Sequence, residues 1–112
     1  MLRLELFHLT SIDEDWGDNP QDFWLQLEAD IGIKGDEASA EVFTVYAVSP
    51  MRLTKMLEID DIELGRGLFI MADFNIKKLE SRLKKLLLHC ERHSWDESVK
   101  AISQYAIWEL ES

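Results

Sequence analysis

Apolar and polar residues alternate most regularly between Phe23 and Ile33. Apolar side chains occupy every second position of this segment, and the intervening positions include Trp24, Glu28 and Asp30. A repeat of two places the two sets on opposite faces of a strand. The segment therefore predicts a strand with one buried and one exposed face.

Three other segments have strand character. Residues 2–9 alternate more loosely and predict a first strand, followed by a polar loop over residues 13–20. Residues 41–48 are rich in β-branched and aromatic residues on both faces, which predicts an inner strand in a hairpin with the strand before it. Residues 68–72 form a short apolar run that predicts a buried strand.

Helical spacing dominates the second half. Pro50 opens a short helix, and Asp60 and Asp61 are expected in the loop that follows it. Asn75 suits a helix N-cap, and apolar residues then recur at helical spacing to Cys90. Residues 94–97 read Ser-Trp-Asp-Glu, a capping box that starts another helix. Residues 106–111 are compatible with a frayed helix end or a final short strand.

This order predicts an α+β fold, with a mainly antiparallel sheet and two C-terminal helices packed on one of its faces. The 112 residues, of which 46% are apolar, suit one domain spanning residues 1–112. A single cysteine excludes an internal disulfide and suits a reducing compartment. The N-terminal segment lacks the unbroken apolar run of a signal peptide, so we expect a cytoplasmic protein.

The net charge is the property of the composition that says most about function. The chain has 22 acidic and 12 basic side chains, a formal net charge of −10. Residues 1–41 contain 11 acidic and two basic residues, so the negative charge is concentrated in the first third. Such a surface disfavours nucleic acid and anionic membranes and attracts cationic proteins. Solubility alone is the competing explanation for acidic charge.

Candidate catalytic and metal-binding chemistry is sparse. His89 and His93 lie four residues apart, but the zinc protease pattern requires a glutamate directly after the first histidine, where Cys90 stands. Cys90 continues an apolar helical stripe and is expected in the core. Asp13, Asp15 and Asp18 resemble a calcium loop, but Trp24 occupies the position of its closing glutamate. We expect no metal, no cofactor and no catalytic role.

Surface recognition of a partner protein remains. Tryptophan among carboxylates suits an anchor with a charged rim against a cationic surface, although tryptophan that merely covers the second sheet face is the alternative. The candidate binding residues are Asp13, Glu14, Asp15, Trp16, Asp18, Asp22, Trp24, Glu28, Asp30, Asp60 and Asp61.

The chain resembles a known family at several places. They are residues 23–27 (Phe-Trp-Leu-Gln-Leu), 31–35, 43–50, 65–70, the Ser94–Glu97 box and Trp108–Glu111. In this order they resemble the immunity protein 8 family of bacterial polymorphic-toxin and contact-dependent growth inhibition systems. The resemblance implies an intracellular antidote that binds the C-terminal toxin domain of an effector, one to one, and occludes it. The acidic charge favours a basic nuclease as the toxin, with ribonuclease ahead of deoxyribonuclease.

Two alternatives differ in class from an immunity protein. One is an acidic adaptor or subunit that docks a basic housekeeping protein. The other is a small metal-dependent hydrolase that uses His89 and His93, which metal analysis of the purified protein would reveal.

Overall fold

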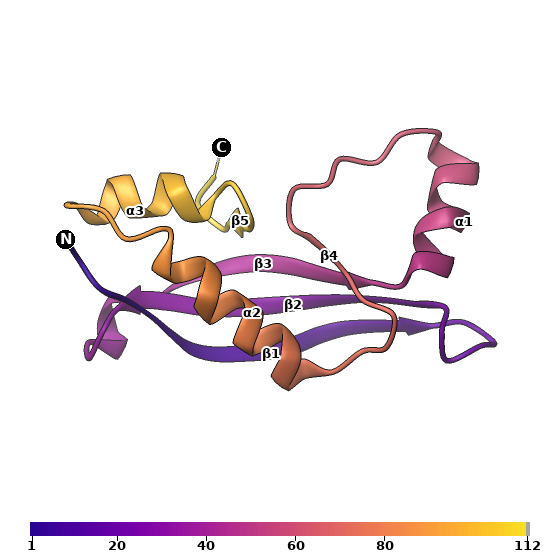
Figure 1. Cartoon of the computed structure of the whole chain (residues 1–112), viewed down its shortest axis with the longest axis horizontal. Coiled ribbons are helices and arrows are strands. Elements are labelled where there is room, and N and C mark those ends of the chain that lie inside the picture. The colour runs from indigo at the N-terminus through magenta and orange to yellow at the C-terminus, as the bar shows by residue number, and fades with distance from the viewer. Residues whose placement is uncertain (112) are drawn as a thin grey trace.

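The computed structural model describes residues 1–111 and shows an α+β fold (Figure 1). A five-stranded sheet is accompanied by three α-helices and one short 3₁₀ helix. In chain order the elements are β1 (Leu4–Trp16), β2 (Phe23–Ile33), η1 (Glu37–Ser39), β3 (Glu41–Val48), α1 (Pro50–Asp60), β4 (Leu68–Ile70), α2 (Ile76–Leu88), α3 (Trp95–Ile102) and β5 (Ile107–Trp108).

The sheet is mainly antiparallel, as predicted. Its strand order is β1-β2-β3-β4, and β5 pairs with the first part of β3. Only β4 runs parallel to its neighbour β3, because α1 and the segment over residues 61–67 lie between them and bring the chain back before β4 begins (Figure 1). The short strand β5 confirms the second of the two expectations for the C-terminal residues.

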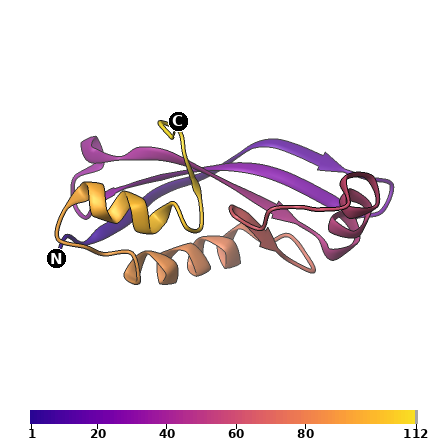
Figure 2. The same ribbon diagram turned by 90° about the horizontal axis from the view of Figure 1, so that it is seen from above.

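One face of the sheet carries the core. The alternate residues of β2 from Phe23 to Ile31 are at most 1% exposed, which confirms the face assigned from the sequence. Leu79, Leu83 and Leu87 of α2 complete this core together with Val99 and Ile102 of α3. Figure 2 shows α2 and α3 on the same side of the three long strands. Within residues 1–111, no helix covers the opposite face, and none has the length and apolar content of a bilayer span.

The first strand is longer than the sequence predicted. A polar loop was expected over residues 13–20, but β1 continues to Trp16, with Asp13 opposite Gln26 and Trp16 opposite Phe23. Two register shifts, at residues 6–8 and 11–13, interrupt the alternation of β1. The loop was predicted from the polar, turn-forming residues over 13–20, and the bulges also interrupt the period-two pattern that would have extended the strand.

Two further expectations were wrong in detail. β4 is a three-residue edge strand, half-buried at Leu68 and Phe69, and Ile70 is 57% exposed. It was expected to be buried, but no strand lies beyond it in the described sheet. Asp60 belongs to α1 rather than to a loop, and Asp61 caps this helix at a φ of 62°.

Candidate protein-binding site

The uncovered face of the sheet brings together residues from all three long strands. Directly opposed residues in antiparallel strands share a face, so the register identifies its members. Asp15 lies opposite Trp24, and Gln26 lies between Asp13 on β1 and Tyr46 on β3. We call this surface the open face; its central residues are Asp13, Asp15, Trp24, Gln26, Glu28, Asp30, Thr44 and Tyr46.

An aromatic pair lies on the open face near the end of the sheet that is followed by α1. The Trp24 and Tyr46 ring centroids lie 5.4 Å apart, with the rings inclined by 32°. Both side chains are only half-buried. A preformed aromatic pair of this kind offers a large contact area at little cost in conformational entropy, as binding anchors usually do.

Four carboxylates share the open face with this pair, and most of them carry an unbalanced charge. Among residues 1–111, Asp13, Glu28 and Asp30 take part in none of the ion pairs. Asp15 accepts a 3.0 Å bond from Arg52 Nη1 but keeps 64% of its side chain exposed. The open face therefore presents a negative potential to solvent, which favours a cationic partner.

Asp22 was predicted as one of the candidate binding residues, but it does not lie on the open face. Its side chain is 6% exposed, between Arg52 Nε and Lys55 Nζ, each 2.5 Å from one of its carboxylate oxygens. Hydrogen bonds from Lys55 and then Arg52 hold the pKa of the Asp22 carboxyl below its ordinary value. Asp22 thus joins the β1–β2 turn to α1 and lies buried rather than on the surface where it was expected.

Glu14 and Trp16 point to the other face of the sheet. Trp16 packs against Phe23 and Phe74, with centroids 5.2 and 6.4 Å away, although it is still 43% exposed. Its indole N–H donates to Glu14, and this bond, with a second from Ser11, lowers the pKa of Glu14. These two residues support the edge of the core rather than the open face.

The remaining candidates lie outside the open face, at the end of the molecule that contains α1 and the β1–β2 turn (Figure 1). Asp18 is exposed in the turn between β1 and β2. Asp60 and Asp61 are exposed at the end of α1. The candidate list thus divides between the open face, the turn and the end of α1.

Cys90 belongs to the core, as predicted. It is 1% exposed, and burial raises the pKa of its thiol. His89 is exposed at the C-cap of α2, and His93 is exposed in the segment before α3. Within the described residues, His, Cys, Asp and Glu side chains form no group of three or more suited to a metal ion.

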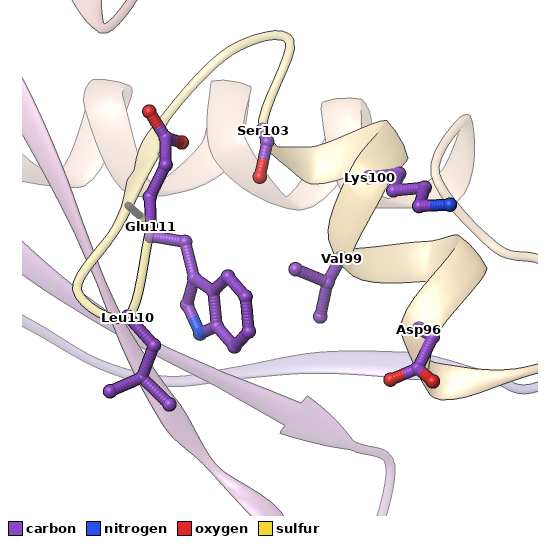
Figure 3. Close-up of a pocket in the computed structure, with 7 residues that line it drawn as sticks. Asp96, Val99, Lys100, Ser103, Leu110 and Glu111 are labelled. Atoms are coloured by element: carbon purple, nitrogen blue, oxygen red, sulfur yellow. The ribbon is translucent and has the colours of Figure 1, made fainter.

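A groove of about 520 Å³ lies between α3 and the C-terminal segment, on the helix side of the sheet. Figure 3 shows Asp96, Val99 and Lys100 of α3 along one wall and Leu110 and Glu111 opposite them. Arg66 pairs with Glu111 at 2.5 Å and so fixes this segment. Ser103 also lines the groove, and its lining contains no histidine or cysteine.

The sequence did not single out Tyr46, Thr44 or Gln26 as members of the site. Apolar residues occur on both faces of β3, which hid the fact that Tyr46 faces solvent. The position of Tyr46 in the hairpin could have identified it. Tyr46 lies opposite Gln26, which is two residues after Trp24 on the same face of β2.

The fold and the open face together define an α+β protein whose exposed sheet surface is acidic and aromatic. Residues 3–112 match the family model described as immunity protein 8. The chain belongs to the immunity protein 8 family, which confirms the resemblance and extends it into β1. The comparisons found no match among curated proteins and none among solved structures.

Proposed function

We propose that this chain neutralises a cognate toxin domain by binding it one to one through the open face. The observation that supports this most directly is the Trp24–Tyr46 pair on the same face as Asp13, Glu28 and Asp30, which take part in none of the ion pairs among residues 1–111. Membership of an immunity protein family supports a toxin-neutralising function independently of the geometry.

We further propose that the toxin is a nuclease, with a ribonuclease favoured over a deoxyribonuclease. A nuclease needs a basic cleft to hold phosphate groups, and that cleft attracts a protein of net charge −10. The carboxylates of Asp13, Glu28 and Asp30 would take the place of phosphates, and the two aromatic rings would take the place of bases. Inhibition then requires occupation of the cleft and no catalysis by the immunity protein.

The place of action follows from this role. A toxin delivered into the cytoplasm, as in contact-dependent growth inhibition, must be intercepted there, so we propose that the protein acts in the cytoplasm. The single buried thiol of Cys90 is compatible with that compartment.

Titration against the toxin domain encoded beside this gene tests the proposal. Calorimetry should give one site per toxin and a dissociation constant below about 10⁻⁷ M. A nuclease assay on RNA and DNA should show activity that falls to zero at one equivalent of this protein. Absence of binding at micromolar concentration would exclude the role, and a toxin without nuclease activity would exclude only the nuclease assignment.

A further inference from the structure

The chain exposes an unusual number of apolar side chains at the end of α1. Residues 57–64 read Leu-Glu-Ile-Asp-Asp-Ile-Glu-Leu, and we call them the apolar–acidic segment. Ile59, Ile62 and Leu64 are 81%, 77% and 82% exposed, and Leu57 is 39% exposed. Four large apolar side chains within eight residues form a patch of the kind that marks interaction sites.

Nothing in the rest of the described chain covers this patch. α1 contains no buried residue, although its N-terminus is anchored by the Ser49 cap and by the Arg52–Asp22 pair. Figure 1 shows the chain after α1 following a wide path away from the sheet before it returns to β4. The segment is thus held at its base while its apolar side chains remain in water.

The acidic members of the segment indicate which partner would cover it. The segment carries Glu58, Asp60, Asp61 and Glu63 and no basic residue. The flanking bases are already paired, Lys55 with Asp22 and Arg66 with Glu111. A second copy of this chain would bring like charges together in a symmetric contact, whereas a cationic surface would neutralise them.

The interaction of Glu63 with Asp60 agrees with this choice. The Asp60 carboxylate, which accepts a hydrogen bond from Glu63 in its protonated form and repels it in its charged form, raises the pKa of Glu63. Two acidic groups that share a site in this way gain stability when a lysine or arginine arrives beside them. The segment is therefore suited to a partner that supplies a basic rim.

We propose that residues 57–64 form a second binding element, in which Ile59, Ile62 and Leu64 enter an apolar depression with a basic rim on the toxin domain. This inference rests on the proposed function. It adds that the toxin contacts two separate parts of the immunity protein, the open face and the end of α1.

The test replaces three anchors that are already exposed, in the variant Ile59→Ser/Ile62→Ser/Leu64→Ser. Because these side chains make no core contacts, thermal unfolding should match that of the wild type. Binding to the toxin domain, measured by biolayer interferometry, should weaken at least about tenfold, mainly through faster dissociation. The matched control Leu88→Ser/Leu110→Ser removes side chains that are 69% and 63% exposed elsewhere, and it should bind as tightly as the wild type.

The outcomes separate this inference from the proposed function. A triple variant that binds within twofold of the wild type overturns the second binding element and leaves toxin binding intact. A wild-type protein that forms dimers in sedimentation analysis, and loses them in the triple variant, also overturns it, since the patch then pairs with itself. A wild-type protein that does not bind the toxin removes the proposed function and this inference together.

Discussion

Arg52 Nε lies 2.5 Å from Asp22 Oδ1, and this ion pair joins the turn between β1 and β2 to the first turn of α1. The same guanidinium reaches Asp15 on β1, and the backbone N–H of Arg52 donates to Ser49 Oγ. Ser49 Oγ in turn accepts from the N–H of Phe23 at the start of β2. One cluster therefore fixes the end of the sheet, one edge of the open face and the base of the apolar–acidic segment.

Asp22→Asn should destabilise the protein at neutral pH. The substitution leaves Arg52 and Lys55 without their buried counter-charge, so we expect the melting temperature to fall by about 4 °C or more. Asp18→Asn, in the exposed turn nearby, is the matched control and should melt close to the wild type. Differential scanning calorimetry at pH 7 makes the comparison, and equal melting temperatures for both variants would contradict the role of the cluster.

The stabilisation provided by the Asp22 carboxylate should decrease at low pH. The pKa of Asp22 is lower in the folded protein than in the unfolded chain, so its stabilisation is complete above the unfolded value of about 3.9. That stabilisation is lost as the pH falls through the folded pKa. The difference in stability between wild type and Asp22→Asn should therefore shrink on acidification, and urea titrations between pH 7 and pH 2 would show it.

Substitutions of Trp24 and Trp16 should have different effects, the first on toxin affinity and the second on the stability of the fold. Trp24→Ala removes the half-buried ring that packs against Tyr46 on the open face, and we expect toxin affinity to fall roughly 30-fold with a small change in stability. Trp16→Ala removes packing against Phe23 and Phe74, and we expect a loss of about 2 kcal/mol in the free energy of unfolding with affinity nearly unchanged. The reverse pattern, measured by calorimetry and urea unfolding, would move the binding site to the edge of the core.

The faces of β2 could be predicted from the sequence because its alternation is uninterrupted. The alternation within β2 predicts that Trp24, Glu28 and Asp30 share one face of the strand, and the strand register confirms this. The starts of helices α2 and α3 could also be predicted from the sequence. Asn75 and Ser94 are favoured N-cap residues, and both side chains accept the N-cap hydrogen bond in the structure.

The partners of these residues across the sheet could not be predicted. The two bulges of β1 cancel in the alternation of faces, but they decide which β2 residues lie opposite Asp13 and Asp15, and a bulge leaves no reliable mark in one sequence. Asp22 reads as one more surface acid, and only the fold shows that Arg52 and Lys55, some 30 residues later, enclose it. Register and long-range ion pairing are properties of the folded chain, which local patterns do not contain.

Charge reversal on the open face should slow association with the toxin. Glu28→Lys/Asp30→Lys changes the local charge by four units where no intramolecular partner exists among the described residues, so electrostatic steering is lost. We expect the association rate constant to fall roughly tenfold at low salt and the difference to narrow at 0.5 M salt, where charges are screened. Stopped-flow fluorescence provides both rates.

The control for this experiment has the same charge change on the opposite side of the molecule. Asp96 and Glu97 are exposed in the first turn of α3, on the helix side of the sheet. Asp96→Lys/Glu97→Lys should associate at close to the wild-type rate. Equal slowing by both variants would show that net charge, rather than the open face, governs the encounter.

Glu41→Gln should loosen the attachment of the C-terminal elements to the sheet. Each oxygen of the Glu41 carboxylate accepts an indole N–H, from Trp95 at 2.5 Å and from Trp108 at 3.2 Å. Glutamine retains one oxygen that can accept an indole N–H, but its NH₂ group replaces the second oxygen. One of the two partly buried indole N–H groups, of Trp95 or Trp108, therefore loses its acceptor. We expect a loss of about 1–2 kcal/mol in the free energy of unfolding, because an unmade buried hydrogen bond costs about that much.

Tryptophan fluorescence and urea unfolding would measure this effect, since Trp95 and Trp108 report on the site directly. Glu109→Gln, an exposed substitution of the same chemistry two residues before the Arg66–Glu111 pair, should unfold with the wild type. Toxin affinity should be retained in both variants because Glu41 lies outside the open face and outside residues 57–64. If Glu41→Gln keeps the wild-type unfolding midpoint, the two indoles do not depend on this carboxylate, and α3 and β5 must be held by the apolar contacts of Val99, Ile102 and Trp108 alone.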